Sequence, residues 1–552
     1  MKLYKISLVM FGAALLTTSC NDIDEQYPET GVLTKEQNQE INEIVPERAQ
    51  ATFQGMFSIM ATPHRGLPGS ANATRADDFG YVMAAFSLDL EGADMFMQNN
   101  NYNWFSACGE YSSRNADYAN PYIRYVIPYR QIGIINDVIS GIDENTDNPD
   151  LLNQRAQAFA MRAFAYMALA PYFAFNYSHP DDPCIPILKA DTDYGNNPRA
   201  SVKEVWESIK EDLDYAVANL TADRTGKDQI NVNVAYGLRA RANLYMGNYA
   251  EAAADAEKAM QGFTPASQAE ISVPAFCNLN EHNWIWGINV PTEMAQIDGY
   301  CTSSSWLSAF SGDGYAAATE NVPTINRLLY NKIADTDIRK NWWLDENLHT
   351  PNWAGLTWTD PKTGASATGD EIAKFEIEEL KAAFLPLNSV KFGMKSGVGS
   401  IINNNDFPLM RVEEMILIQV EGLAKSGNEA RAKQILENFV KTYRDPAYSV
   451  EANLQQRGLS DEIWFQRRVE LWGEGFFMFD CKRLGKPVVR THGSGTTNQP
   501  AAFAFNIAAT DGWLNMRFPQ TEMDNNKGVV DNTGGQQPVA GQNPNLRDGV
   551  TD

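Results

Sequence analysis

Histidine and cysteine are scarce in this chain of 552 residues, which contains 5 of the first and 6 of the second. No histidine stands in an HExxH pattern and no serine in GxSxG, and the chain has neither a P-loop nor a GxGxxG before a helix. No two cysteines form a CxxC pair, so the spacing predicts no zinc site. The sequence therefore carries none of the common catalytic or metal-binding motifs.

Positive charge is also under-represented, with 45 Lys and Arg against 69 Asp and Glu and a formal net charge of -24. Such an acidic surface repels nucleic acid and anionic lipid, whereas neutral sugars meet no such penalty. Beyond the N-terminus the chain has no run of about 18 apolar residues, so no membrane-spanning helix is predicted.

The N-terminus has the pattern of an export signal. Lys2 and Lys5 accompany an apolar run that ends at Leu16, is too short to span a bilayer, and is followed by three small residues and Cys20. This arrangement resembles a lipobox, although the leucine lies one position early. We predict that residues 1–19 are a cleaved signal peptide and that Cys20 is the acylated first residue of a lipoprotein. An ordinary secretory signal with a chance cysteine is the alternative.

The remaining cysteines are odd in number, so at least one stays unpaired, and the sequence leaves their pairing open: Cys108, Cys184, Cys277, Cys301 and Cys481. In a chain of this length the burial of apolar side chains, and not disulfide bonding, must provide most of the stability.

Helical periodicity recurs along the chain. Apolar residues at spacings of three and four predict helices in residues 154–173, 202–220, 235–260, 410–443 and 459–483. Ser201 and Glu204 form a capping-box pattern before the second of these segments. The third and fourth segments each turn at a Gly-Asn pair, and the third resembles part of a tetratricopeptide repeat. We therefore predict a mainly α fold, in which repeat-like helical pairs from distant segments form a scaffold with long loops and a few short strands.

The middle of the chain has a different composition. Residues 268–406 are rich in Gly, Ser, Thr, Asn and Pro, which predicts loops, and residues 284–290 alternate like a short strand. The end of the chain, from Asp524, has few apolar residues and is predicted to be irregular, with a composition that also favours mobility. Seven of the 12 tryptophans lie in the middle segment: Trp284, Trp286, Trp306, Trp342, Trp343, Trp353 and Trp358.

Two groups of acidic residues could carry chemistry. Glu470 and Glu474 could form the carboxylate pair of a glycosidase. Arg467 and Arg468 lie within one turn, among aromatic residues, so a structural ion-pair network is the preferred interpretation. Residues 191–195 hint at a calcium loop but lack the later bidentate Glu, which favours an ordinary turn. No metal and no cofactor is predicted.

Aromatic rings in polar loops are the best candidates for ligand binding, because buried rings elsewhere serve the core equally well. On their positions, Trp286, Trp464 and Trp472 are predicted to lie in the core. The two polar loops that hold other rings contain Tyr102, Asn103 and Trp104 early in the chain, and Tyr300, Trp306, Asp313 and Tyr315 in the middle. The alternative is that Trp104 and Trp306 only fix their loops to the scaffold.

Four segments resemble motifs of the SusD/RagB-like outer-membrane lipoproteins. Residues 406–414 (DFPLMRVEE) are similar to the family's D-x-P-hydrophobic-x-R-x-x-E helix entry. Residues 467–483 (RRVELWGEGFFMFDCKR) are similar to its R-x-x-E-L-x-G-E-G-x-R-x-x-D-x-x-R signature, except that Phe477 stands where Arg is common. Residues 198–213 and 518–522 resemble its p-R-x-s-v … D-L and P-x-x-E segments.

This resemblance covers nearly the whole mature chain and implies one SusD-like domain over residues 20–552. Its parts would be a helical scaffold mainly in residues 35–60, 120–265 and 408–485, loop-rich ligand regions near 60–120 and 268–407, and an irregular end over 486–552.

The resemblance also implies a function. Members of the family are outer-membrane lipoproteins that face the cell exterior, and they bind oligosaccharides or other nutrients for a partner TonB-dependent transporter of the SusC type. They are binding proteins and not enzymes. In such proteins the early loop and the Trp-rich middle form the binding face, which here would add Asp94 and Arg114 to the loop residues named above. A surface glycosidase or peptidase, and a helical-repeat adaptor that binds protein, are the alternatives.

Overall fold

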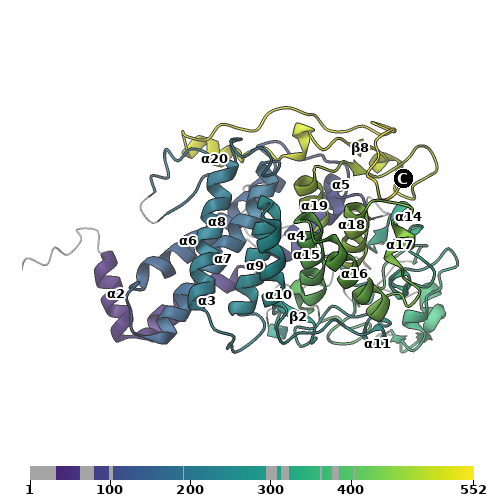
Figure 1. Cartoon of the computed structure of the whole chain (residues 1–552), viewed down its shortest axis with the longest axis horizontal. Helices are drawn as coiled ribbons and strands as arrows, with labels where there is room; N and C mark the ends of the chain where they lie inside the picture. Colours follow the sequence, from purple (N-terminus) through teal and green to yellow (C-terminus); the bar gives the residue numbers. More distant parts are fainter. Residues whose placement is uncertain are drawn as a thin grey trace, which may run out of the picture.

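Paired helices standing side by side form the body of the protein in the computed structural model (Figure 1). The structure describes residues 33–61, 80–97, 103–189, 192–293, 307–311, 322–360, 363–375, 384–402 and 404–552. The predicted mainly α fold is confirmed. None of the helices in these ranges combines the length and the hydrophobicity that a membrane span needs.

The scaffold is assembled from two distant parts of the chain, as the sequence predicts. Helix α10 packs against both α9 and α15 and so joins the two parts, which Figure 1 shows in teal and green. The helices are α6 (Ala119–Gly141), α7 (Pro149–Phe173), α8 (Val202–Asn219), α9 (Val232–Met246) and α10 (Tyr249–Ala259), then α15 (Val412–Lys425), α16 (Glu429–Tyr443), α17 (Val450–Asn453), α18 (Leu459–Glu470) and α19 (Phe477–Leu484).

Local sequence sets the helix ends. Ser201 caps α8: its hydroxyl accepts a hydrogen bond from the Glu204 N–H at 3.2 Å, and the Glu204 carboxylate accepts from the Ser201 N–H at 2.8 Å. Gly247 follows α9 with a φ of +82°, and Gly427 follows α15 with a φ of +91°. Both Gly-Asn turns are therefore where the sequence places them.

Small residues bring α10 and α15 into close contact. A Cβ atom on Gly422 would lie 2.5 Å from the Tyr249 carbonyl oxygen and 3.0 Å from the Cβ atom of Ala253. Ala252 and Ala256 of α10 are fully buried. This part of the scaffold is held by apolar packing between backbones that approach closely.

Helix α4 (Gly80–Glu91) lies in a region that we expected to be loop-rich. Ten of its twelve residues are buried, so it has no polar face and its sequence lacks the 3.6-residue alternation that marks a surface helix. The other short helices are α2 (Lys35–Ile44), α3 (Pro46–Ser58), α5 (Asn103–Gly109), α11 (Gln268–Ile271), α14 (Arg327–Tyr330) and α20 (Gln520–Asn525), with 3₁₀ turns η3 (Ile338–Trp342), η4 (Pro351–Trp353), η5 (Gly369–Lys374), η6 (Ala501–Phe503) and η7 (Gly512–Leu514).

The strands are short, and two of the four pairs join segments that are far apart in the chain. Among the described residues they form four two-stranded antiparallel sheets: β1 (Met95–Phe96) with β3 (Thr324–Ile325), β2 (Trp284–Ile288) with β6 (Phe407–Arg411), β4 (Thr357–Thr359) with β5 (Ser366–Thr368), and β7 (Val488–Val489) with β8 (Asn506–Ile507). Strand β2 is the predicted strand of the middle segment, and its pairing with β6 ties that segment to the start of α15.

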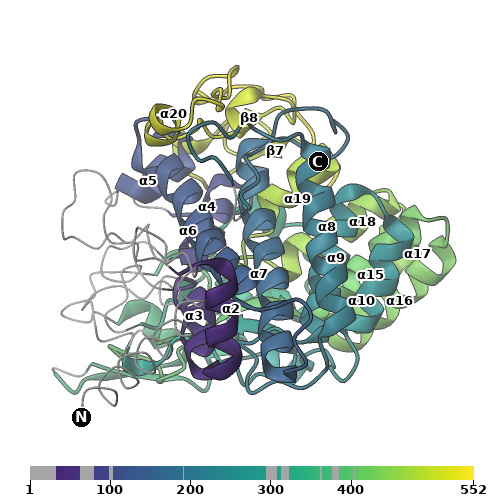
Figure 2. The same cartoon turned by 90° about the vertical axis from the view of Figure 1, so that its left-hand side faces the viewer.

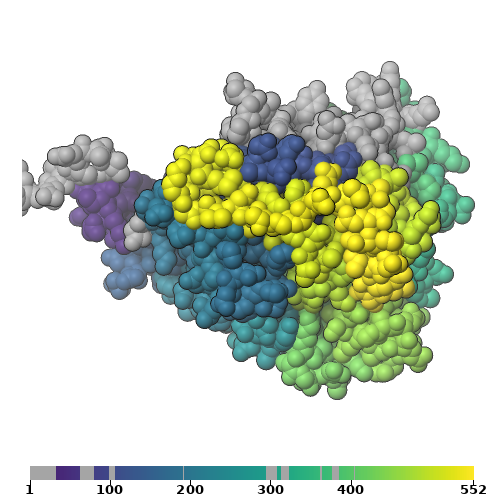
Figure 3. Space-filling model, turned by 90° about the horizontal axis from the view of Figure 1, so that it is seen from above, coloured from purple at the N-terminus to yellow at the C-terminus, as the bar shows by residue number. Residues whose placement is uncertain are grey.

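The C-terminal segment, residues 486–552, is mainly irregular and crosses the top of the helices (yellow in Figures 2 and 3). Side-chain contacts fix it there, although its composition favoured mobility. Asp548 pairs with Arg468 at 2.7 Å, and the Asn532 amide donates to the Phe173 carbonyl at 3.0 Å.

Candidate functional site

The sequence-predicted ligand residues fall largely outside the described part of the chain. Asn103 and Trp104 begin α5, but the structure does not describe their side chains. The residues that lie outside the described ranges altogether are Cys20, Tyr102, Tyr300, Trp306, Asp313 and Tyr315, together with Asp191 of the calcium-like turn. Cys301 also lies outside the described ranges.

Asp94 and Arg114 are both described, and both are buried, at 4% and 2% exposure. Asp94 binds the guanidinium of Arg468 through both carboxylate oxygens, at 2.6 and 2.8 Å. Arg114 pairs with Glu91 at 2.9 Å and donates to the Leu514 carbonyl at 3.0 Å. These two side chains therefore join segments inside the protein and do not face a ligand in this conformation.

The two segments that carry the predicted loops nevertheless meet at one pair of strands. Strand β1 pairs antiparallel with β3, with Phe96 opposite Thr324 and Met95 opposite Ile325. The chain leaves β1 beyond Phe96 and enters β3 at Thr324, so the early and the middle segments meet at the same end of this ladder. In the sequence, Trp104 comes after β1, and Trp306 comes before β3.

Most of the tryptophan-rich middle belongs to the core. Trp286, Trp464 and Trp472 are 0%, 1% and 3% exposed, which confirms their predicted core positions. The others of the middle segment that are described are also buried, at 2% exposure or less: Trp284, Trp342, Trp343, Trp353 and Trp358. The high tryptophan content of this segment thus serves packing.

A cluster of buried charges lies where the loops of the middle segment meet the helices. This central charge cluster consists of Asp337, Arg339, Lys391, Arg411, Glu413, Arg444, Glu470 and Glu474, and each member is at most 5% exposed. It contains four acids and four bases, so it is neutral as a whole. Sequence reasoning found Glu470 and Glu474 but gave them the wrong partners. The bases that bind them come from four other segments.

Glu470 is at the centre of this cluster. Arg444 donates to it at 2.8 and 3.0 Å, Arg411 at 3.2 Å and Arg339 at 3.3 Å. Glu474 accepts from Lys391 at 2.8 Å. Burial by itself would raise the pKa of Glu470, but the three guanidinium groups outweigh it and hold that pKa below its ordinary value.

The neighbouring arginines of the signature make a second network. Arg467 binds Asp480 at 2.8 Å, and Arg468 joins Asp94 to Asp548. Phe477, which stands where the family commonly has Arg, packs its ring 5.1 Å from the Arg468 guanidinium carbon. The signature residues are therefore structural ties between α18, α19, the early segment and the chain end.

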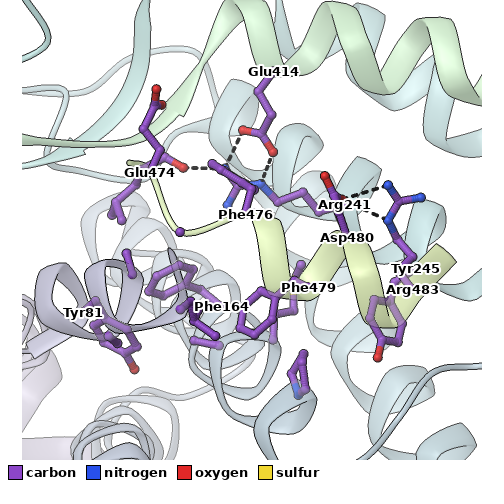
Figure 4. Close-up of a pocket in the computed structure, with 18 of the residues that line it drawn as sticks. Tyr81, Phe164, Arg241, Tyr245, Glu414, Glu474, Phe476, Phe479, Asp480 and Arg483 are labelled. Carbon is purple, nitrogen blue, oxygen red and sulfur yellow. Dashed lines mark hydrogen bonds and ion pairs between the residues drawn. The ribbon is translucent and has the colours of Figure 1, made fainter. Parts of the chain in front are cut away.

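A separate pocket lies between α4, α7, α9, α15 and α19, with a volume of about 140 Å³ (Figure 4). Its floor is aromatic, with the rings of Phe164, Tyr245 and Phe479 drawn in Figure 4 below a row of charged residues. Half-buried alanines leave the space open: Ala84, Ala85 and Ala168. Among the described residues, no group of three or more His, Cys, Asp or Glu side chains is arranged to hold a metal ion.

The family model described as "Starch-binding associating with outer membrane" matches residues 74–244, and the model described as "SusD family" matches residues 299–543. A search of curated proteins finds no match.

Solved structures share the fold. A SusD-like carbohydrate-binding protein from Bacteroides vulgatus is 22% identical with a TM-score of 0.68, over 88% of this chain and 97% of its own. A SusD superfamily protein from Bacteroides thetaiotaomicron is 19% identical with a TM-score of 0.65, over 88% and 99%. A laminarin-binding SusD-like protein is 15% identical with a TM-score of 0.58, over 88% and 99%. From its motifs, its fold and the two family models, this chain belongs to the SusD/RagB-like family.

Proposed function

We propose that this protein is a cell-surface lipoprotein that binds oligosaccharide and passes it to a partner TonB-dependent transporter in the outer membrane. The observation that carries the proposed site is the β1–β3 ladder, because it brings the early and middle segments to one edge. Rings supplied by Trp104 and Trp306 at this edge would stack on sugar faces, and the polar side chains beside them would bind hydroxyls.

The proposed ligand face contains fewer residues than the sequence alone suggests. Asp94 and Arg114 are left out because both are buried in ion pairs. The face consists of Tyr102, Asn103, Trp104, Tyr300, Trp306, Asp313 and Tyr315. A neutral glucan is the first ligand to test, since one family model is described as starch-binding and one similar structure binds laminarin. The net charge of -24 places no penalty on a neutral sugar.

Binding without hydrolysis is the second part of the proposal. A glycosidase needs one carboxylic acid whose pKa is raised so that it can donate a proton. Glu470 and Glu474 have the opposite environment: burial opposes ionisation, but arginine and lysine partners lower the pKa of both. They are held as carboxylates within the protein, and a polysaccharide incubated with the protein should be bound and recovered uncut.

The binding site is tested by calorimetry with a soluble form of the protein and a panel of neutral glucans. We expect Trp104→Ala and Trp306→Ala each to weaken binding by about 30-fold, with the melting temperature nearly unchanged. Tyr194→Ala removes a ring that is 60% exposed elsewhere and serves as the control, with no expected effect. A lowered melting temperature would instead assign the rings to loop fixation. Parent-like affinity in both tryptophan variants would show the proposed face to be wrong.

The lipid anchor and the transporter are tested separately. Cys20→Ala should abolish incorporation of labelled fatty acid, because the thiol that would carry the lipid is gone. Cross-linking in whole cells should capture a large outer-membrane barrel with the parent protein. Labelling that persists in the variant contradicts the anchor, and repeated capture of other proteins without glycan affinity favours the adaptor function.

A further inference from the structure

The pocket between α4, α7, α9, α15 and α19 has a chemistry unlike that of a sugar site. Most of its polar groups already have hydrogen-bond partners within the protein, although the Arg467 Nη1 group on its wall is buried without a partner among the described residues. Arg241 holds Glu414 through two contacts of 2.6 Å each. The Tyr245 hydroxyl donates to the Phe175 carbonyl at 2.7 Å, and the Tyr81 hydroxyl donates to Gln131 at 2.6 Å. A sugar in this pocket would lose the hydrogen bonds that its hydroxyls make with water and regain few of them.

The charge at the edge of the pocket is also balanced. Glu414 neutralises Arg241, and Asp480 lies between Arg467 at 2.8 Å and Arg483 at 2.8 Å. Figure 4 shows Arg241 pointing toward Glu414, and Arg483 pointing toward Asp480, along one side of the pocket. An ionic ligand would have to compete with these internal pairs, so an uncharged ligand is favoured.

The size of the pocket sets the size of the ligand. An apolar cavity of about 150 Å³ in an unrelated protein stays dry and binds benzene, and this pocket measures about 140 Å³. Solvent can reach it, because Ala84, Met167 and Ala168 on its wall are only half-buried. We propose that this pocket is a second binding site, independent of the loops, for a small uncharged and mainly apolar molecule such as a monocyclic aromatic compound.

Toluene and indole are suitable probes, and glucose is the polar control. With the ¹³C-methyl groups of methionine as reporters in the soluble protein, we expect saturable shifts of the Met167 signal, assigned with Met167→Leu. The signal of Met523, which does not line the pocket, should stay in place. Binding itself is measured on the parent sequence, and a variant is needed only to assign the Met167 signal. Unchanged Met167 signals with both probes would overturn the proposal.

A matched pair of variants locates the site. Ala168→Leu fills the pocket and should abolish saturable binding of toluene and indole, whereas Ala254→Leu adds the same side chain to the exposed face of α10 and should leave binding unchanged. Phe479→Ala enlarges the pocket and should shift the preference toward naphthalene. Toluene binding that survives Ala168→Leu would place the probe elsewhere and refute this site. Glycan affinity should be the same in all these variants, so failure here and failure of the loop face are distinguishable.

Discussion

The two main parts of the molecule are held together by different forces. In the helical layer, α9, α10 and α15 meet through alanines and glycines, and the layer also carries ion pairs that are exposed at its surface. Lys203 and Glu207 on α8, for example, have side chains 54% and 49% exposed. In the central charge cluster the ion pairs are inside: Glu470 and Arg444 have side chains that are fully buried. Ion pairs between acidic and basic side chains are therefore exposed to solvent in the first example and fully buried in the second.

The reason lies in the regularity of the backbone. A helix satisfies its own backbone groups and needs only a complementary apolar face from its neighbour. The middle segment has short strands and loops, which offer few repeated contacts. Charged side chains with several hydrogen bonds in fixed directions can join such loops at defined points. Arg444, for example, binds Glu413 and Glu470 and also donates to the Ala266 carbonyl at 2.9 Å.

The largest expected effect comes from breaking the buried cluster. Glu470→Gln preserves the shape of the side chain but leaves Arg339, Arg411 and Arg444 short of one negative charge in a fully buried site. Removing one partner of a buried ion pair costs roughly 3–5 kcal/mol, so we expect a loss of this order in the free energy of unfolding by urea. A loss below about 1 kcal/mol would mean that the cluster is dispensable for the middle segment.

Asp89 is a buried acid that has no arginine partner among the described residues, and it sharpens the comparison with Glu470. Asp89 on α4 accepts a hydrogen bond from the Gly475 N–H at 2.9 Å, beside the cluster. Burial raises its pKa to about 7, with the nearby Asp94 adding to the shift. A carboxyl group with a raised pKa in the folded state contributes stability below its unfolded pKa of about 4, and that contribution is lost as the pH rises to about 7.

Asp89→Asn tests this directly, because an amide oxygen can accept the same hydrogen bond without titrating. The free energy of unfolding of the variant minus that of the parent should increase by about 1.4 kcal/mol per pH unit between about pH 4 and 7, and level off above pH 7. Measuring urea unfolding of both proteins across this range isolates the group from all others. A difference that does not change with pH would show that Asp89 stays ionised in the folded protein.

Sequence alone predicts the helical layer far better than the charge cluster. The pairs α9–α10 and α15–α16, the capping box at Ser201 and strand β2 all follow from local periodicity and turn chemistry. Local patterns cannot supply partners that lie far apart in the chain. Arg467 and Arg468, the neighbours in sequence, bind Asp480 and Asp94 instead of Glu470. The true partners of Glu470 lie 26 residues away at Arg444, 59 at Arg411 and 131 at Arg339.

The same limit explains two further differences. Helix α4 is buried on nearly every side, so it lacks the polar face by which helices are recognised. Asp94 and Arg114 are polar residues in a segment that we expected to be loop, and polarity alone predicts exposure. Their ion pairs with Arg468 and Glu91 compensate for burial, which only the folded structure shows.

The close packing of the helical layer should give a smaller effect. Gly422→Ala places a Cβ atom against the Tyr249 carbonyl, and overpacking of this kind costs about 1–3 kcal/mol. Gly133→Ala on α6 is the matched control, since its Cβ atom would meet nothing within 4 Å. This control should be neutral or stabilising by up to about 1 kcal/mol, because alanine favours the helix. Equal melting temperatures for the two variants would show that α10 and α15 can move apart freely.

The smallest effect is expected from the exposed pair on α8, which completes the comparison with Glu470. Glu207→Gln makes the same chemical change, and Glu207 lies one turn after its partner Lys203, 3.7 Å away. Water screens both charges there, and exposed pairs of this kind contribute only about 0.3–0.5 kcal/mol. The free energies of unfolding of Glu207→Gln and Glu470→Gln, measured with urea under the same conditions, should therefore differ by several kcal/mol. Since the substitution is identical, a similar loss in both would mean that burial is not what gives the central charge cluster its strength, and that the loops of the middle segment are held by their apolar contacts instead.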